Sequence, residues 1–206
     1  MASIQKIKEL TDEELVAWIR DRDKEMYQEL MRRYQDRALR YAWSIIKDRD
    51  RANDIVQKAF IRAFINLKSF NLKKKFSNWF FRIVHNQAIN HIKKHRKEIS
   101  FAGDEPWSQN IKSTDEPMEI LLQNKESSLF IKQCLSDLPL NYRMPLELFY
   151  FEEKSYTDIG EILRLPMDTV STRINRAKKM LKIIYTRATK LRHPEHMPQT
   201  VPRLDS

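Results

Sequence analysis

The sequence has 206 residues, 41% of them apolar, with a formal net charge of +10 and a single cysteine, Cys134. This length allows one or two small domains, and the presence of only two glycines favours helices over tight turns. One cysteine excludes an internal disulfide and a cysteine zinc cluster. No apolar run approaches the roughly 20 residues that span a bilayer, and the start of the chain lacks the apolar core of a signal peptide. We therefore expect a cytoplasmic protein that does not insert into membranes.

The charges are distributed in blocks along the chain. Residues 1–97 carry a net charge of +11, residues 98–128 one of −5, and residues 129–190 one of +4. A basic protein surface favours a polyanionic partner, with nucleic acid as the first candidate and an anionic membrane surface as the second.

Four helices are predicted within residues 1–97, which form the first expected domain. The first helix covers Thr11–Arg20, because Thr11 and Glu14 have the spacing of a capping box. Apolar residues at intervals of three and four predict a longer helix from Lys24 to the charged run at Lys47. The same period predicts helices over Arg51–Leu67 and Phe76–Lys97, and Ser77 is expected to cap the last of these.

Residues 98–117 lose the helical period and contain several acids, one glycine and two prolines, which predicts a flexible acidic linker. Helices are expected again over about Met118–Leu135 and over Leu140–Phe151, where Pro145 removes one backbone hydrogen bond and should bend the axis. Residues 118–190 form the second expected domain. Residues 191–206 contain three prolines and are expected to be a disordered tail.

The segment Ser155–Ile184 is predicted to form two helices joined by a tight turn. Leu165 and Pro166 end the first helix, and Asp168 is expected to cap the second. The second helix has one apolar stripe and an opposite face that is basic and polar; the stripe consists of Val170, Ile174, Ala177, Leu181 and Ile184. This pattern is typical of a helix-turn-helix whose second helix enters the DNA major groove. The alternative is an ordinary packed hairpin with a solvated basic face.

Aromatic residues alternate with cations and amides from Lys73 to Arg96. This composition suits a nucleic-acid strand with unstacked bases, because ring faces accept bases while Lys and Arg neutralise phosphates. The helical period places Phe76 and Phe80 on one buried face. Trp79 and Phe81 flank that face, and the sequence leaves open whether they belong to the core or contact DNA.

Candidates for catalysis or metal binding are few. Cys134 lies on an expected buried face without a nearby histidine, which favours a structural role. His91 and His95 share a helix face, but no neighbouring side chain completes a metal site. Two glycines cannot build a phosphate-binding loop. We therefore expect no catalytic site, no metal site and no cofactor.

Several segments in sequence order resemble one known family. They are Ala52–Phe60, Phe76–Arg96, Leu138–Arg143, Ser155–Ile159, Ile162–Leu163, Thr169–Ser171, Arg173 and Arg176–Ala177. The chain resembles the extracytoplasmic-function (ECF) sigma factors of the sigma-70 family, which are promoter-recognition subunits of bacterial RNA polymerase. The resemblance implies an all-α protein with two small helical domains joined by a flexible acidic linker, the second domain carrying the helix-turn-helix.

The resemblance also implies a function and the residues that perform it. A sigma factor binds core RNA polymerase, recognises an upstream and a downstream promoter element, helps to melt the DNA, and is often held inactive by an anti-sigma factor. By this analogy, Asp54, Gln57 and Lys58 contact the polymerase clamp. The upstream element is contacted by Arg143, Thr169, Ser171, Thr172, Arg173, Asn175, Arg176 and Lys179. The downstream element, as duplex and then as single strand, is held by Lys68, Asn71, Lys73, Lys74, Lys75, Asn78, Trp79, Arg82, Asn86, Asn90, Lys93 and Lys94.

Four positions depart from the family pattern. Asn53 and Lys58 replace residues that are usually acidic in the polymerase-binding stretch. Arg164 stands where a glycine usually closes the first helix of the pair, and a left-handed backbone there would cost on the order of 1 kcal/mol. Gly160 replaces the usual alanine, a helix penalty of about 1 kcal/mol.

Two alternatives to a sigma factor remain open at this stage. One is a conventional helix-turn-helix regulator that acts without docking on polymerase. The other is a basic helical scaffold that binds a membrane or a protein.

Overall fold

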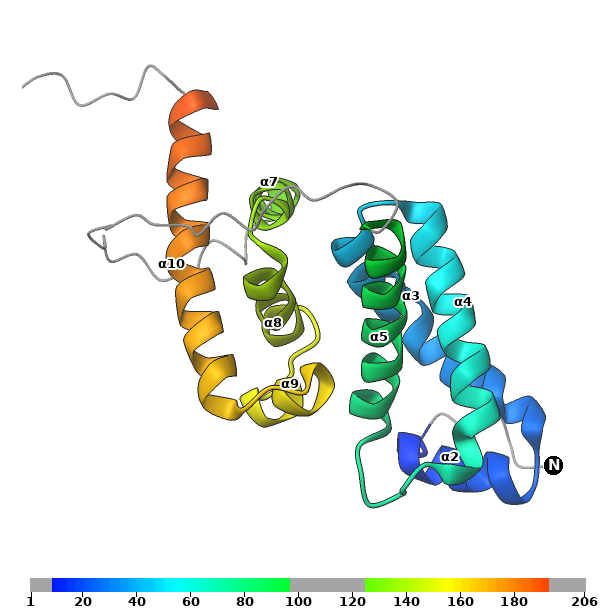
Figure 1. Ribbon diagram of the computed structural model, residues 1–206. Coiled ribbons are helices and arrows are strands. Elements are labelled where there is room, and N and C mark those ends of the chain that lie inside the picture. The colour runs from blue at the N-terminus through cyan, green and yellow to red at the C-terminus, as the bar shows by residue number, and fades with distance from the viewer. Residues whose placement is uncertain (1–8, 97–124, 193–206) are drawn as a thin grey trace, which may run out of the picture.

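A computed structural model describes residues 9–96 and 125–192 of the chain. The described residues form α-helices and short 3-10 turns without a β-strand, which confirms the all-α prediction. The described helices fall into two groups that lie side by side, with α5 next to α9 (Figure 1). We call residues 9–96 the N-terminal unit and residues 125–192 the C-terminal unit. The expected linker at 98–117, the helix start near Met118 and the tail at 191–206 fall wholly or mostly outside the described residues.

The N-terminal unit consists of four α-helices and two 3-10 turns. Their bounds are α2 (Asp12–Asp21), η1 (Lys24–Met26), α3 (Tyr27–Ile46), α4 (Arg49–Asn66), η2 (Leu67–Ser69) and α5 (Phe76–Arg96). Helix α3 packs against α4 and α5, and α4 packs against α5. The helix expected from Lys24 is thus confirmed, with its first turn tightened into η1.

An aromatic cluster fills the space between these helices. The ring of Tyr34 lies 5.5 Å from that of Phe76 and 5.4 Å from that of Phe80, between centroids. Phe60 approaches Phe80 to 4.6 Å. Phe76, Phe80 and Phe81 are fully buried, which confirms the expectation for the first two and assigns Phe81 to the core. Aromatic pairs at such separations stabilise a core by about 0.5–1.5 kcal/mol each beyond the area they bury.

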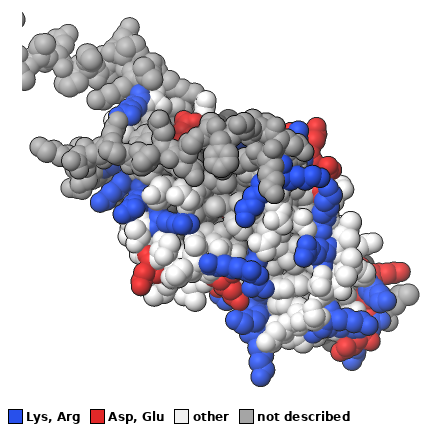
Figure 2. Space-filling model, viewed as in Figure 1, with Lys and Arg blue, Asp and Glu red and all other residues white. Residues whose placement is uncertain are grey.

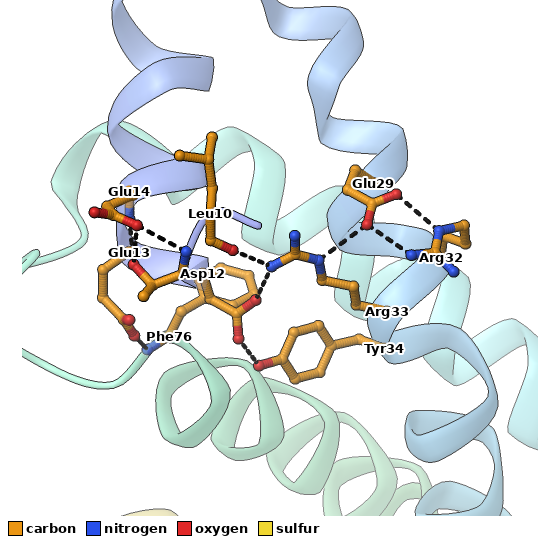
Figure 3. A network of polar contacts seen from close by, with 10 residues as sticks. Leu10, Asp12, Glu13, Glu14, Glu29, Arg32, Arg33, Tyr34 and Phe76 are labelled. Atoms are coloured by element: carbon orange, nitrogen blue, oxygen red, sulfur yellow. Dashed lines mark hydrogen bonds and ion pairs between the residues drawn. The ribbon is translucent and has the colours of Figure 1, made fainter. Parts of the chain in front are cut away.

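A polar network fastens α2 to α3 and α5 (Figure 3). The Arg33 guanidinium contacts the Asp12 carboxylate at 2.9 Å, and the Tyr34 hydroxyl donates to the same carboxylate. The Phe76 backbone N–H donates to the Glu13 carboxylate at 2.7 Å. These bonds join residues more than twenty positions apart, so they position the start of α5.

The C-terminal unit consists of α7 (Lys125–Ser136), α8 (Leu140–Tyr150), α9 (Tyr156–Leu163) and α10 (Met167–Arg192). Pro145 lies inside α8, as the sequence predicts. Val170, Ile174, Ala177 and Leu181 are buried, which confirms these four positions of the predicted apolar stripe, and the fifth, Ile184, is partly buried against the core. Helix α10 packs against α7, α8 and α9 and thereby orients its other face outward.

Two expected helix caps are wrong by a small shift. Helix α5 begins at Phe76, so Ser77 lies inside its first turn, where its hydroxyl accepts a hydrogen bond from Lys154 at 2.6 Å. Helix α10 begins at Met167, so Asp168 lies in the first turn and is not the cap. An acid there still interacts favourably with the helix dipole. The Thr11–Glu14 capping box is confirmed.

Candidate promoter and polymerase interfaces

One face of α5 lines a polar cavity of about 380 Å³. The face presents Trp79, Arg82, Asn86 and Asn90, which recur at three to four residues. Helix α4 supplies the opposite wall through Arg62 and Asn66. The cavity therefore combines an aromatic ring, amides and guanidinium groups, the functional groups that can bind an unpaired base and its phosphate.

The Trp79 ring belongs partly to the core and partly to this cavity. It is half-buried and packs on Phe70 at 5.1 Å and on Phe76 at 5.7 Å, between ring centroids. Its remaining surface lines the cavity. The core holds the ring at a fixed position, which lowers the entropic cost of stacking a base on it.

Five predicted residues lie in or near the loop that precedes α5, and all of them are exposed: Lys68, Asn71, Lys73, Lys74 and Lys75. The side-chain oxygen of Asn71 accepts a hydrogen bond from the Lys73 backbone N–H at 2.9 Å. The backbone carbonyl of Asn71 accepts another from the Lys74 backbone N–H at 2.9 Å. These bonds form a local turn of the kind that asparagine favours. Lys93 and Lys94 are exposed near the other end of α5, so cations flank the cavity at both ends.

Asn78 occupies a different position from the other predicted residues of α5. It is only 2% exposed, and its amide donates to the Asp158 and Glu161 carboxylates of α9 at 2.6 and 3.1 Å. In the face shown in Figure 2, acidic side chains lie among Lys and Arg side chains near the start of α5. The structure thus separates Asn78 from the open cavity.

The outward face of α4 has a polar half and an apolar half. Asp54, Gln57 and Lys58 are all exposed along it. Ile61 and Ile65 continue the same helical face and are 60% and 72% exposed. Contiguous exposed apolar surface is a feature of protein-binding sites, so this face of α4 is a candidate for contact with another protein.

The helix pair α9–α10 has the geometry expected of a helix-turn-helix. Ser155 and Asp158 form a capping box at the start of α9. Arg164 ends α9 with φ 56° and ψ 50°, the left-handed conformation anticipated from the missing glycine. The predicted residues of α10 are Thr172, Asn175, Arg176 and Lys179, which are exposed, and Thr169, Ser171 and Arg173, which are partly buried. The exposed set recurs at three to four residues and forms one surface stripe.

The structure shows where the Arg143 side chain lies and why a glycine stands at position 160. Arg143 is 6% exposed, and its guanidinium donates to the Ser136 carbonyl at 2.7 Å. In this structure it supports the end of α7 and is not on the exposed stripe of α10. A Cβ at Gly160 would lie 2.8 Å from the Leu165 carbonyl oxygen, so glycine permits the tight turn into α10.

Sequence reasoning missed several residues of these surfaces. Ile61 and Ile65 continue the spacing of Asp54, Gln57 and Lys58, so helical periodicity could have identified them. The cavity walls supplied by Arg62, Asn66, Gln87 and Arg164 depend on how the helices pack, which no local pattern indicates.

The described residues contain no helix long and apolar enough to cross a membrane. Within the same ranges, no three His, Cys, Asp or Glu side chains are grouped so that they could hold a metal ion.

Comparison with known proteins decides the family. Residues 30–98 match Sigma-70 region 2, and residues 131–181 match Sigma-70, region 4. The ECF RNA polymerase sigma factor SigW of Bacillus subtilis (strain 168) is 34% identical over 167 residues, which cover 78% of this chain and 89% of the relative. The chain belongs to the ECF sigma factors. The ECF RNA polymerase sigma-E factor of Escherichia coli (strain K12) is 30% identical to this sigma factor over 179 residues, which cover 84% of this chain and 93% of the relative.

Solved structures support the fold of this ECF sigma factor. CnrH in complex with the cytosolic domain of CnrY aligns with a TM-score of 0.63 at 20% identity, covering 85% of this chain and 97% of that one. RpoE from Bartonella quintana, in complex with the anti-sigma factor NepR, aligns with a TM-score of 0.62 at 20% identity, covering 78% of this chain and 96% of that one. The region 2 match contains α4, α5 and the residues that these helices contribute to the cavity, and the region 4 match contains α9, Arg164 and the exposed stripe of α10.

Proposed function

We propose that this ECF sigma factor binds core RNA polymerase through the outward face of α4 and holds promoter DNA through α5 and α10. The single observation that carries the proposal is the presence of both sigma regions in one chain: region 2 contains the outward face of α4 and the polar face of α5, and region 4 contains the exposed stripe of α10. A conventional helix-turn-helix regulator needs only the second region. That alternative leaves the apolar face of α4 without a role.

The chain contributes recognition and DNA melting, and it carries no catalytic step of its own. We assign the upstream element to the seven α10 residues from Thr169 to Lys179 named above. The downstream element passes from the loop lysines to the cavity, where Trp79 stacks on a base and Arg82 neutralises a phosphate. Extruding a base costs a few kcal/mol, which stacking and phosphate contacts offset.

The domain division expected from the sequence remains part of the proposal. Residues 1–97 act on polymerase and the downstream element, 98–117 link the domains, 118–190 act on the upstream element, and 191–206 form the tail. The protein works where polymerase works, in the cytoplasm. An anti-sigma factor is a candidate partner, because the RpoE of similar fold is recorded with one.

Binding to core RNA polymerase tests the proposal directly. The purified chain should form a stable complex with the core enzyme and should direct run-off transcription from genomic DNA. Replacing Ile61 and Ile65 together by serine should weaken this complex at least about tenfold, because burial of two large apolar side chains is lost. Leu72→Ser is the matched control, since Leu72 is 40% exposed but lies in the loop before α5. Absence of any polymerase complex would refute the proposed function.

A further inference from the structure

A second cavity, of about 340 Å³, lies between α3 and the helices α7 and α8. Its surface is mostly apolar and includes the side chains of Tyr41, Trp43 and Phe151. Protein cavities that bind small organic molecules have volumes of about 300–1,000 Å³, are mostly apolar, and carry a few polar groups that orient the ligand. None of the described residues that we assign to polymerase or promoter DNA lines this cavity, so it has no role in the proposed function.

Two cations in the wall of this cavity share one neutral acceptor. The Lys47 ammonium donates to the Ser136 backbone carbonyl at 2.5 Å, and the Arg143 guanidinium donates to the same carbonyl at 2.7 Å. A carbonyl oxygen carries only a partial negative charge, so it does not neutralise two adjacent cations. Partial burial and, second, the Arg143 charge lower the pKa of the Lys47 ammonium. The positive charge at this point of the cavity is therefore in excess.

The Arg143 side chain also has a donor without an acceptor. The residue is only 6% exposed, and its Nε has no hydrogen-bond partner among residues 9–96 and 125–192. Buried side-chain donors in native proteins nearly always have a partner, so an exception requires an explanation. An acceptor that enters the cavity from solution provides one. Arg40 lines the same cavity and adds a third cation to it.

The acids near the cavity do not supply this acceptor. The Glu152 carboxylate lines the cavity but is paired with the Arg37 guanidinium at 2.8 Å. Glu147 and Asp137 favour the charged form of Arg143, yet burial outweighs them and lowers the pKa of the guanidinium. The Nε of Arg143 bonds to neither. The cavity thus keeps a buried cationic donor for an anion from outside the chain.

We propose that this cavity binds a small organic anion with an apolar body, of the class of aromatic carboxylates. The Trp43 and Phe151 side chains pack on the apolar body, and the carboxylate accepts from Arg143 Nε and from the Lys47 ammonium. Donors of both residues lie within 2.7 Å of the same Ser136 oxygen, so one carboxylate can reach both side chains. The ligand contacts α3, α7 and α8 together, and its binding stabilises the folded chain by mass action.

The test uses two probes that share a ring system and differ in charge. The anion 2-naphthoate and its neutral analogue 2-naphthylmethanol are titrated into the full chain, without polymerase, by isothermal calorimetry. Lys47→Met removes one cation and keeps most of the apolar stem. Lys24→Met is the matched control, because Lys24 is an exposed lysine in η1, outside the cavity. Ser44→Phe fills the cavity without changing any charge.

We expect the wild type to bind 2-naphthoate with a Kd below about 1 mM, and at least about tenfold more tightly than 2-naphthylmethanol, because hydrogen bonds to charged groups are the strong ones. The ligand should also raise the Tm of the wild type. Lys47→Met should weaken binding of 2-naphthoate about tenfold and leave binding of 2-naphthylmethanol unchanged. Lys24→Met should bind both probes as the wild type does, and Ser44→Phe should bind neither.

Three results would each overturn the proposal. They are absence of 2-naphthoate binding to the wild type, equal affinities for the two probes, and wild-type binding of 2-naphthoate by Lys47→Met. Far-UV circular dichroism of the unliganded variants shows that each is folded before titration. If Ser44→Phe does not fold, Lys47→Met decides, because Lys47 is exposed and its replacement leaves the core intact.

Discussion

Replacing Arg164 by glycine should stabilise the C-terminal unit. Arg164 has φ 56° and ψ 50°, a left-handed conformation in which a Cβ costs roughly 1–2 kcal/mol. Glycine removes this cost, but its greater conformational freedom in the unfolded chain lowers the free energy of unfolding by about 0.4–1 kcal/mol. We therefore expect Arg164→Gly to raise the free energy of unfolding by about 0.5–1 kcal/mol.

Arg164→Ala is the matched control, because it removes the same long side chain and keeps the Cβ. Urea unfolding of both variants and the wild type, followed by far-UV circular dichroism, gives the three midpoints. In thermal unfolding, each 1 kcal/mol should move Tm by about 2–4 °C for a chain of this length. The free energy of unfolding of Arg164→Gly should exceed that of Arg164→Ala by at least the amount by which it exceeds that of the wild type. Equal stabilities of the two variants would mean that the backbone at Arg164 is unstrained.

Three further predictions follow from other sites. Gly160→Ala should destabilise the fold, because overpacking against the Leu165 carbonyl costs about 1–3 kcal/mol and the gain in helix propensity is about 1 kcal/mol; urea midpoints measure this, and a stabilised variant would contradict it. Burial lowers the pKa of His85 to about 4, so between pH 6.5 and 4 only the unfolded state binds the proton. The free energy of unfolding therefore falls as the pH falls through this range, by up to about 3 kcal/mol. His85→Phe should remove this dependence when the free energy of unfolding is measured against pH. Lys179→Ala should weaken binding to all promoter duplexes alike and lower the salt dependence, whereas Asn175→Ala should change which sequence is preferred, as competition binding will show; unchanged preference would remove Asn175 from the groove.

The helices were predictable because their apolar residues repeat with the helical period over many positions. The Thr11–Glu14 box and the stripe from Val170 to Leu181 are local patterns, and both are confirmed. The cap assigned to Ser77 failed because the first N–H of α5 is bonded by Glu13, a residue of another helix. A hydrogen bond between residues so far apart in the chain cannot be predicted from the sequence around Ser77.

The candidate site was predictable by composition but not by arrangement. The face of α5 that carries Trp79 and Arg82 follows from helical spacing, and the structure places it on a cavity. Phe81 was ambiguous because two sides of α5 are buried, one of them against Tyr41 at a ring separation of 5.6 Å. The burial of Asn78 arises from a contact with a helix eighty residues later in the chain, which no periodicity indicates.

The contact between α5 and α9 joins two parts of one polypeptide, so it forms within a single molecule. An intramolecular contact does not depend on protein concentration, so dilution leaves the fraction of chains that make it unchanged. A contact with a separate chain, by contrast, weakens as both chains are diluted. The radius of gyration of this sigma factor, measured by small-angle X-ray scattering, should therefore be the same across a dilution series.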